Sequence, residues 1–148
     1  MNSANWPVVH LIARLILGLL FFMAGYWKVF TLTAQKHAEQ FFVQGFVDHW
    51  IPVWLLNILG YSIPYFELIT GLMILVGFRL REALIAVGFL LVVTTYGHAL
   101  QQPLFDIDGH TFTRLILIFL LLLAPVSANK YALDYWLKKR NRYLNATK

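Results

Sequence analysis

The chain has 148 residues, of which 59% are hydrophobic and 13% are charged, and its formal net charge is +5. Soluble domains carry about 25% charged residues, so this composition excludes an ordinary soluble protein and predicts a polytopic membrane protein. No cysteine is present, which excludes thiol–disulfide chemistry, Fe–S clusters and thiolate-bound metal. The net charge comes mainly from basic residues after Ala128, which flank an apolar segment. We therefore expect contact with membrane lipids and no nucleic-acid binding.

Four apolar segments predict an all-α bundle of four transmembrane helices, in a single domain over residues 1–148. A hydrocarbon core of about 30 Å needs about 20 residues per helix, so the fourth segment is short. The second segment is interrupted by Asn57, Gly60 and Pro64. We favour a short interfacial piece followed by a span, and the alternative is one long kinked helix. The predicted spans are about 6–30, 61–78, 82–100 and 111–125.

Lysine and arginine predict the orientation. With four spans, both termini and the loop between the second and third spans share one side, which holds most of the basic residues, including the tail over residues 129–148. The positive-inside rule therefore places both termini in the cytoplasm, with the chain in a bacterial inner membrane. Residues 1–5 lack lysine and arginine, so we expect the first span to be retained rather than cleaved as a signal peptide.

A short amphipathic helix is predicted in the loop between the first two spans. Small and aromatic residues recur there at helical spacing, with charged and amide side chains between them. Such a helix would lie at the outer membrane interface and could cover the mouth of the bundle. The alternative is a plain surface anchor. The apolar positions are Ala38, Phe41, Phe42, Gly45 and Phe46.

Three charged residues lie inside apolar segments, namely Arg14, Glu67 and Arg114. A charge near the centre of a bilayer costs roughly 2.5–3.5 kcal/mol, so such residues usually face the protein interior and mark a site. Lys28 and Arg114 lie nearest in depth to Glu67. We expect Arg114 to be its partner, because a guanidinium binds a carboxylate bidentately. The alternative is an ion pair that only fixes helix register. Arg14 points into the bundle or toward the cytoplasmic head groups.

A polar segment begins at the end of the third span and continues through the loop after it, and it carries nitrogen and oxygen ligands that could bind a metal, namely His98, Asp106, Asp108 and His110. The alternative is an ordinary turn, with Asp108 capping the fourth span. We do not expect haem, because His10 and His98 lie at opposite ends of the bundle and cannot ligate one iron together.

A lipid-soluble quinone fits these residues better. Its two carbonyl oxygens need hydrogen-bond donors, and its reduction needs a group that manages protons. We predict that Glu67 relays protons or positions the ring, while Arg114 and His98 hold its oxygens. These three are the predicted catalytic residues. The predicted cofactor-binding residues are Arg14, Lys28, Trp27, Glu67, His98 and Arg114.

Two segments resemble the DoxX family of small four-helix membrane proteins. Residues 13–28 read Ala-Arg-Leu-Ile-Leu-Gly-Leu-Leu-Phe-Phe-Met-Ala-Gly-Tyr-Trp-Lys, and residues 66–79 read Phe-Glu-Leu-Ile-Thr-Gly-Leu-Met-Ile-Leu-Val-Gly-Phe-Arg. Residues 124–134 resemble the closing motif of that family, with both of its glycines replaced. The resemblance implies a four-helix bundle linked to quinol oxidation or thiosulfate:quinone oxidoreduction. Arg14, Lys28 and Glu67 are the positions where the chain meets this pattern.

The sequence therefore predicts a small inner-membrane subunit of a redox system, which binds quinone or quinol within the bundle and serves a partner oxidoreductase. One alternative is a non-enzymatic anchor or assembly subunit. Another is an accessory of a metal-handling or redox-stress system with an outward-facing His/Asp site. Small-residue faces on the first two spans would also permit a homo-oligomer. The sequence does not decide whether the chain is itself an enzyme.

Overall fold

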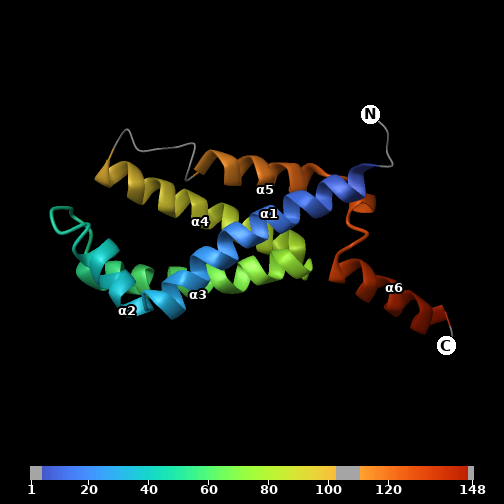
Figure 1. Cartoon of the computed structure of the whole chain (residues 1–148), viewed down its shortest axis with the longest axis horizontal. Helices are drawn as coiled ribbons and strands as arrows, with labels where there is room; N and C mark the ends of the chain where they lie inside the picture. The colour runs from blue at the N-terminus through green and yellow to red at the C-terminus, as the bar shows by residue number, and fades with distance from the viewer. Residues whose placement is uncertain (1–4, 103–110, 147–148) are drawn as a thin grey trace.

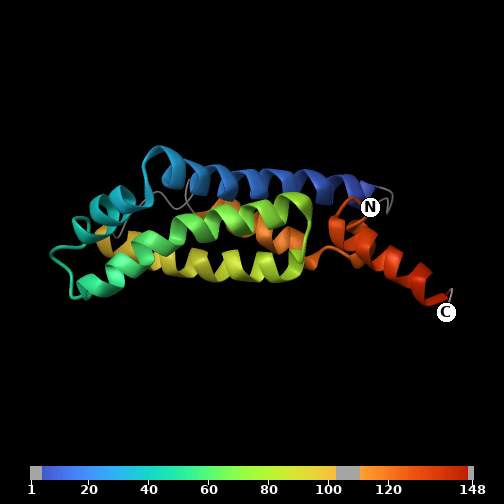
Figure 2. The ribbon, with the colours of Figure 1, turned by 90° about the horizontal axis from the view of Figure 1, so that it is seen from below.

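The computed structural model describes residues 5–102 and 111–146, and these residues contain helices and no strand. Helices that share one hydrophobic core lie side by side (Figures 1 and 2), and we call them the bundle helices. They are α1 (Trp6–Tyr26), α3 (Val53–Val76), α4 (Leu80–Gln101) and α5 (Thr113–Leu123). Shorter elements connect or extend them, namely the π-helical η2 (Trp27–Thr31), α2 (Ala34–His37), the π-helical η3 (Ala38–Val43), the 3₁₀ turn η5 (Val126–Ala128) and α6 (Leu133–Ala146).

Three of the described helices are long and apolar enough to cross a membrane, namely Trp6–Thr31, Val53–Val76 and Leu80–Gln101. The chain is therefore a membrane protein with several apolar helices. The described part of α5 is apolar but has only 11 residues, so the fourth span remains a prediction. The start of α1 and the end of α6 lie at the same end of the molecule (Figure 1).

The second predicted span begins earlier than we expected. We placed its start near residue 61, whereas α3 begins at Val53 and continues without interruption to Val76. Pro64 lies inside this helix, where its ring nitrogen cannot donate to the carbonyl of Gly60, four residues earlier. His37 Nδ1 donates to that carbonyl oxygen instead, at 2.7 Å. The side chain from α2 thus replaces the hydrogen bond that the proline removes, which explains why the helix is not broken.

Glycines bring α1 and α3 into direct backbone contact. A Cβ atom built on Gly25 would meet the backbone nitrogen of Leu68, and one built on Gly71 would meet the backbone of Phe22. Neither neighbour is a flexible side-chain end, so neither can move aside cheaply. Small residues at the contact are the usual means by which membrane helices approach closely, because lipid gives no hydrophobic driving force between them.

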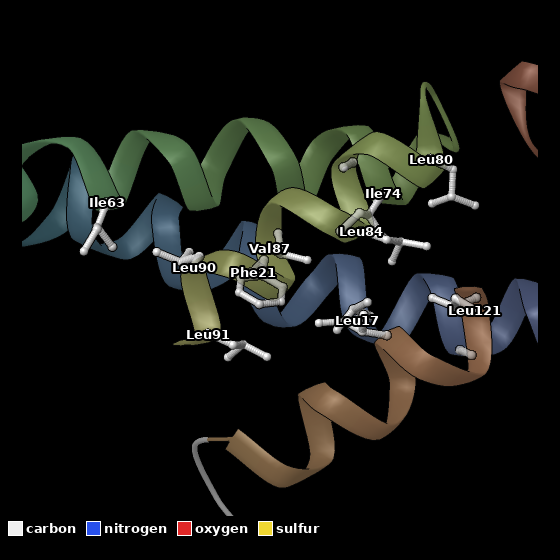
Figure 3. Packing of buried hydrophobic residues seen from close by; sticks show 13 residues of the cluster. Leu17, Phe21, Ile63, Ile74, Leu80, Leu84, Val87, Leu90, Leu91 and Leu121 are labelled. Carbon is white, nitrogen blue, oxygen red and sulfur yellow. The ribbon is translucent and has the colours of Figure 1, made fainter. Parts of the chain in front are cut away.

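One hydrophobic core joins the four bundle helices (Figure 3). Leu17, Ile74 and Val87 are fully buried, and they come from α1, α3 and α4. Ile118 and Leu121 of α5 complete the same cluster. The outward faces are also apolar, as in a bundle whose surroundings are lipid.

The turn from α3 to α4 is held by a residue far along the chain. Gly77 ends α3 with a φ of 70°, a left-handed conformation that glycine adopts without strain, and the Phe78 amide donates to the Met73 carbonyl at 2.9 Å. The Asp134 carboxylate then accepts hydrogen bonds from the amides of Arg79 and Leu80, at 2.8 and 2.9 Å. Asp134 therefore caps the N-terminus of α4, a role that suits an anion at the positive end of a helix.

The glycine contact predicts a sharp difference between two equivalent substitutions. Gly71→Ala should lower the free energy of unfolding by about 1–3 kcal/mol, because the new methyl group overlaps the α1 backbone. Gly88→Ala in α4 is the matched control, since a Cβ there meets nothing within 4 Å. It should be neutral or stabilising by up to about 1 kcal/mol, from helix propensity alone. Unfolding of both variants in detergent micelles would measure this, and equal effects would contradict the packing argument.

Candidate functional site

A cavity of about 550 Å³ lies at the end of the bundle away from the chain termini. This volume is within the range of roughly 300–1,000 Å³ that is typical of small-molecule sites. Aromatic and aliphatic side chains form most of its wall. They come from α1 and η2, from η3 and the turn after it, and from α3 and α4. The aromatic members are Phe21, Trp27, Phe41, Phe42, Phe46, Trp50 and Tyr96.

An ion pair forms the most polar part of this wall. Lys28 Nζ lies 2.6 Å from Glu67 Oε2 and donates a hydrogen bond to it. Glu67 is buried, with a side-chain exposure of 9%, and Lys28 is more open at 22%. A charged hydrogen bond of this length is strong, and the low exposure of Glu67 makes the pair harder to replace with water.

The local backbone explains why Lys28 reaches Glu67. Gly25 lets α1 contact α3 beside Leu68, so the next turn of α1 passes directly alongside Glu67. That turn is π-helical, with the Leu32 amide bonded to the Trp27 carbonyl at 2.9 Å. Inserted π turns re-aim side chains and occur often at functional sites. We expected Arg114 as the direct partner of Glu67, and the structure places Lys28 there instead.

Arg114 also lines the cavity, from the first turn of α5. Its guanidinium carbon lies 5.8 Å from the centroid of the Phe21 ring, which is a cation–π distance. It is also close enough to Glu67 to interact with it electrostatically. Two cations thus act on one buried carboxylate within a largely apolar wall.

Residues 34–46, which we call the cap, cover one side of the cavity. The cap contains α2, η3 and the start of the following turn, and it packs against the first half of α3 (Figure 2). The His37 bond to Gly60 fixes it to α3. Gln101 Nε2 donates to the Gly45 carbonyl at 3.1 Å and fixes it to the end of α4. The segment predicted as an amphipathic helix is therefore helical up to Val43, while its position at a membrane surface remains a prediction.

His37 is a site residue that the sequence analysis missed. Its side chain is buried, lines the cavity and lies between the rings of Phe41 and Phe42, with centroids at 5.5 and 5.4 Å. Burial lowers the pKa of this imidazole below its ordinary value of 6.5, and the charge of Lys28 lowers it further, while the hydrogen bond to Gly60 opposes both. The available signal was Pro64, because a proline within an apolar helix frees a carbonyl that some donor must satisfy.

Five of the predicted cofactor-binding residues come together at this cavity, namely Trp27, Lys28, Glu67, His98 and Arg114. His98 is exposed and contributes from the last turns of α4. The sixth, Arg14, is not among the lining residues. Arg14 is buried toward the other end of α1, where its Nη2 donates to the Tyr131 carbonyl at 2.9 Å. There it fastens the segment before α6 to the bundle.

The predicted metal ligands are mostly outside the described residues. Asp106, Asp108 and His110 all lie in the segment that the structure does not describe, and only His98 is placed. Within residues 5–102 and 111–146, no group of three or more His, Asp or Glu side chains could hold a metal ion. The metal site therefore remains a prediction from the sequence.

The fold and the cavity together define a class: a small helical membrane protein with a charged site inside an aromatic pocket. A family model described as methylamine utilisation protein MauE matches residues 7–103, and the chain belongs to this family. The matched part contains α1, α3, α4 and the cap, and it ends before Arg114. Neither a comparison with curated proteins nor one with solved structures found a match.

The resemblance to the DoxX family is therefore wrong, because the family found is a different one. The structure indicates why the motifs misled. Gly18, Gly25 and Gly71 lie where α1 and α3 approach each other, and Lys28 and Glu67 form the ion pair beside that contact. Small residues are common wherever membrane helices approach closely, so glycines at this spacing are not specific to one family.

Because Lys28 and Glu67 form an ion pair, we expect the effects of their substitutions on the free energy of unfolding to be non-additive. Lys28→Met should lower the free energy of unfolding by about 3–5 kcal/mol, because it removes the cation that is hydrogen-bonded to the buried Glu67 carboxylate and leaves only the electrostatic interaction with Arg114. The double variant Lys28→Met/Glu67→Gln should recover most of this loss, since it removes both charges. Glu82→Gln is the control, because its pair with Arg79 is long, at 4.0 Å, and exposed, so the expected effect is about 0–1 kcal/mol. Additive single and double effects in a thermal unfolding series would contradict the pairing.

The lowered pKa of His37 predicts that acid loosens the cap. The unfolded or undocked imidazole takes up a proton more readily than the docked one, so docking is fully stable above the ordinary pKa of 6.5 and weakens as the pH falls below it. For each unit by which docking lowers the pKa of His37, acid should reduce the protection of the cap amides from exchange by up to about tenfold. Amide exchange of residues 34–43, corrected for intrinsic rates, would measure this. His37→Gln keeps a donor but does not titrate, so it should abolish the pH dependence.

Proposed function

We propose that this protein is a membrane subunit that binds a quinone or quinol in the cavity and serves a partner oxidoreductase. The observation that carries the proposal is the juxtaposition of a buried Lys28–Glu67 pair with an aromatic-lined space of about 550 Å³. A quinone head group is flat, apolar and bears two carbonyl oxygens. It therefore matches a wall that is mostly aromatic with a few convergent polar groups.

Each polar residue has a definable part in such a site. Lys28, Arg114 and His98 can donate hydrogen bonds to carbonyl oxygens, and they come from three different elements. Donors at two separate points would fix the orientation of the ring, while Trp27 and Phe21 supply apolar faces against it. Glu67 is the group suited to hold or pass a proton, since among the residues that the structure describes it is the acidic side chain that lines the cavity.

The electrons would come from or go to another protein. Conversion of a quinone to a quinol takes two electrons and two protons. The chain has no cysteine and so offers no dithiol for electron transfer. The protons can move through Glu67, whereas the electrons require an oxidoreductase partner. The bound quinone would supply the redox chemistry, and this chain would supply binding, orientation and proton handling.

The family name suggests the setting of this exchange. The family description refers to the utilisation of methylamine. The oxidation of an amine releases electrons that a membrane quinone could accept. If the chain lies in a bacterial inner membrane with both termini facing the cytoplasm, the cavity would lie in the outer half of the bilayer. The cap would then lie at the outer interface, between the cavity and water.

A second candidate is a non-enzymatic anchor or assembly subunit. The observation that favours it is the position of the Lys28–Glu67 pair, which joins α1 to α3 where their backbones already touch. A pair at such a contact can fix helix register without any ligand. In this case the cavity would be filled by lipid chains.

Quinone content separates the two candidates. After mild solubilisation and purification, organic extraction should yield near-stoichiometric quinone relative to protein, well above the ratio expected from the copurified lipid. Glu67→Gln should lower this by about tenfold, equivalent to about 1.4 kcal/mol. Ala24→Phe should also lower it, because the ring fills the cavity and leaves both charges in place.

Glu82→Gln is the matched control, because this exposed carboxylate lies at the opposite end of α4 from His98. Its quinone content should equal that of the wild type. Thermal unfolding of each variant shows whether lost quinone reflects lost fold. Quinone at the level of bulk lipid in the wild type, unchanged in the variants, would reject the quinone site and favour the anchor.

A further inference from the structure

The C-terminal helix α6 projects away from the bundle. Both views show it leaving the body of the molecule at the end where α1 begins (Figures 1 and 2). It covers Leu133–Ala146, and its large apolar side chains are open: Trp136 is 59% exposed and Leu144 is 56% exposed. This differs from the bundle helices, each of which buries one face in the shared core.

The sequence of α6 separates into two faces. At 100° per residue, Leu133, Trp136, Leu137 and Leu144 fall on one side of the helix. Lys138, Lys139 and Arg142 fall on the other side, and all three are exposed. Helices with an apolar face, a basic face and low overall hydrophobicity lie in membrane interfaces rather than crossing them. Arg140 lies among the apolar residues, where its long side chain can reach past them to a head group.

The charge of α6 is not offset within the helix. Asp134 is its one acidic residue, and both of its carboxylate oxygens accept hydrogen bonds from the amides that begin α4. The four basic residues have no acidic partner within α6 and all are exposed, and Lys139 Nζ lies 5.6 Å from the centroid of the Trp136 ring. Arg79 in the adjoining turn and Arg81 in the first turn of α4 are also exposed, and the acidic Glu82 lies opposite them, at 4.0 Å from Arg79, so this end of the molecule keeps a further net positive charge.

The hydrogen bonds at the start of α6 fix its depth relative to the bilayer. Asp134 is bonded to the turn that separates Val76, the last residue of α3, from Leu80, the first residue of α4. Because α3 and α4 are candidate membrane spans, this turn is where the chain leaves the apolar part of the bilayer. The bond from Arg14 to the Tyr131 carbonyl holds the preceding residues at the same level. α6 therefore starts at the lipid head groups rather than out in the aqueous phase.

We propose that α6 is a binding element for an anionic lipid surface. Its apolar face enters the head-group region of the membrane that contains the bundle, and its basic side chains bind lipid phosphates. Each lysine or arginine near an anionic leaflet adds to this attraction, which fades with salt. A soluble acidic protein is the less favoured partner of α6, because the attachment of the helix at Asp134 places its apolar face at the bilayer.

The absence of cysteine gives a direct test, since a single introduced cysteine can carry the only thiol-linked label. Leu144→Cys reports the apolar face, and Asn145→Cys is the matched control one residue later, an exposed uncharged position on the side of Lys138. Each full-length variant carries an environment-sensitive fluorophore and is placed in nanodiscs of phosphatidylcholine, with or without phosphatidylglycerol. We expect the label at residue 144 to enter an apolar environment when phosphatidylglycerol is present, and the label at residue 145 to stay in water.

Charge neutralisation and salt complete the test. Lys138→Gln/Lys139→Gln in the Leu144→Cys background should reduce the lipid-bound fraction by roughly tenfold or more, and high salt should do the same. Unchanged thermal unfolding confirms that the bundle is intact. The proposal is overturned if the label at residue 144 stays in water in both lipids. It is also overturned if both labels respond alike, or if residue 144 becomes buried only after a soluble acidic protein is added.

Discussion

The backbone contact between α1 and α3 determines most of what this molecule can do. Gly25 and Gly71 remove the side chains that would hold the two helices apart. The resulting approach brings Lys28 within 2.6 Å of Glu67, and it places the aromatic wall of α1 against the first half of α3. Without this contact Glu67 would lose its hydrogen-bonded cation, and a poorly neutralised carboxylate within a membrane span is costly. The chemistry of the cavity is thus a consequence of helix packing.

A second dependence links the cap to a helix imperfection. Pro64 leaves the Gly60 carbonyl without its helical donor, and His37 supplies the missing hydrogen bond from a different element. The carbonyl that Pro64 leaves free is the point where the cap binds to α3. The residue that weakens the helix therefore also determines where the cap covers the cavity. Membrane helices tolerate proline when a neighbouring group satisfies the freed carbonyl, and here that group also lines the site.

The sequence indicated which residues line the cavity better than it indicated which of them contact one another. Charges within apolar segments pointed to Glu67 and Arg114, and both line the cavity, as do Lys28 and His98. The direct partner of Glu67 was not predictable, because depth alone did not reveal the π-helical turn that re-aims Lys28. The start of α3 is not predictable for a related reason: in the sequence Pro64 indicates a break, whereas the donor that compensates for it, His37, lies in a different helix.

The bonds of Asp134 to the α3–α4 turn have a consequence for biogenesis. Asp134 is separated from Arg79 by 55 positions, and its carboxylate completes the first turn of α4. The chain is made from its N-terminus, so the turn between α3 and α4 exists before the carboxylate that caps it. This cap can form only after the 54 residues that follow Leu80 up to Asp134 have been made. A contact between positions so far apart closes late, because the intervening chain must first be ordered.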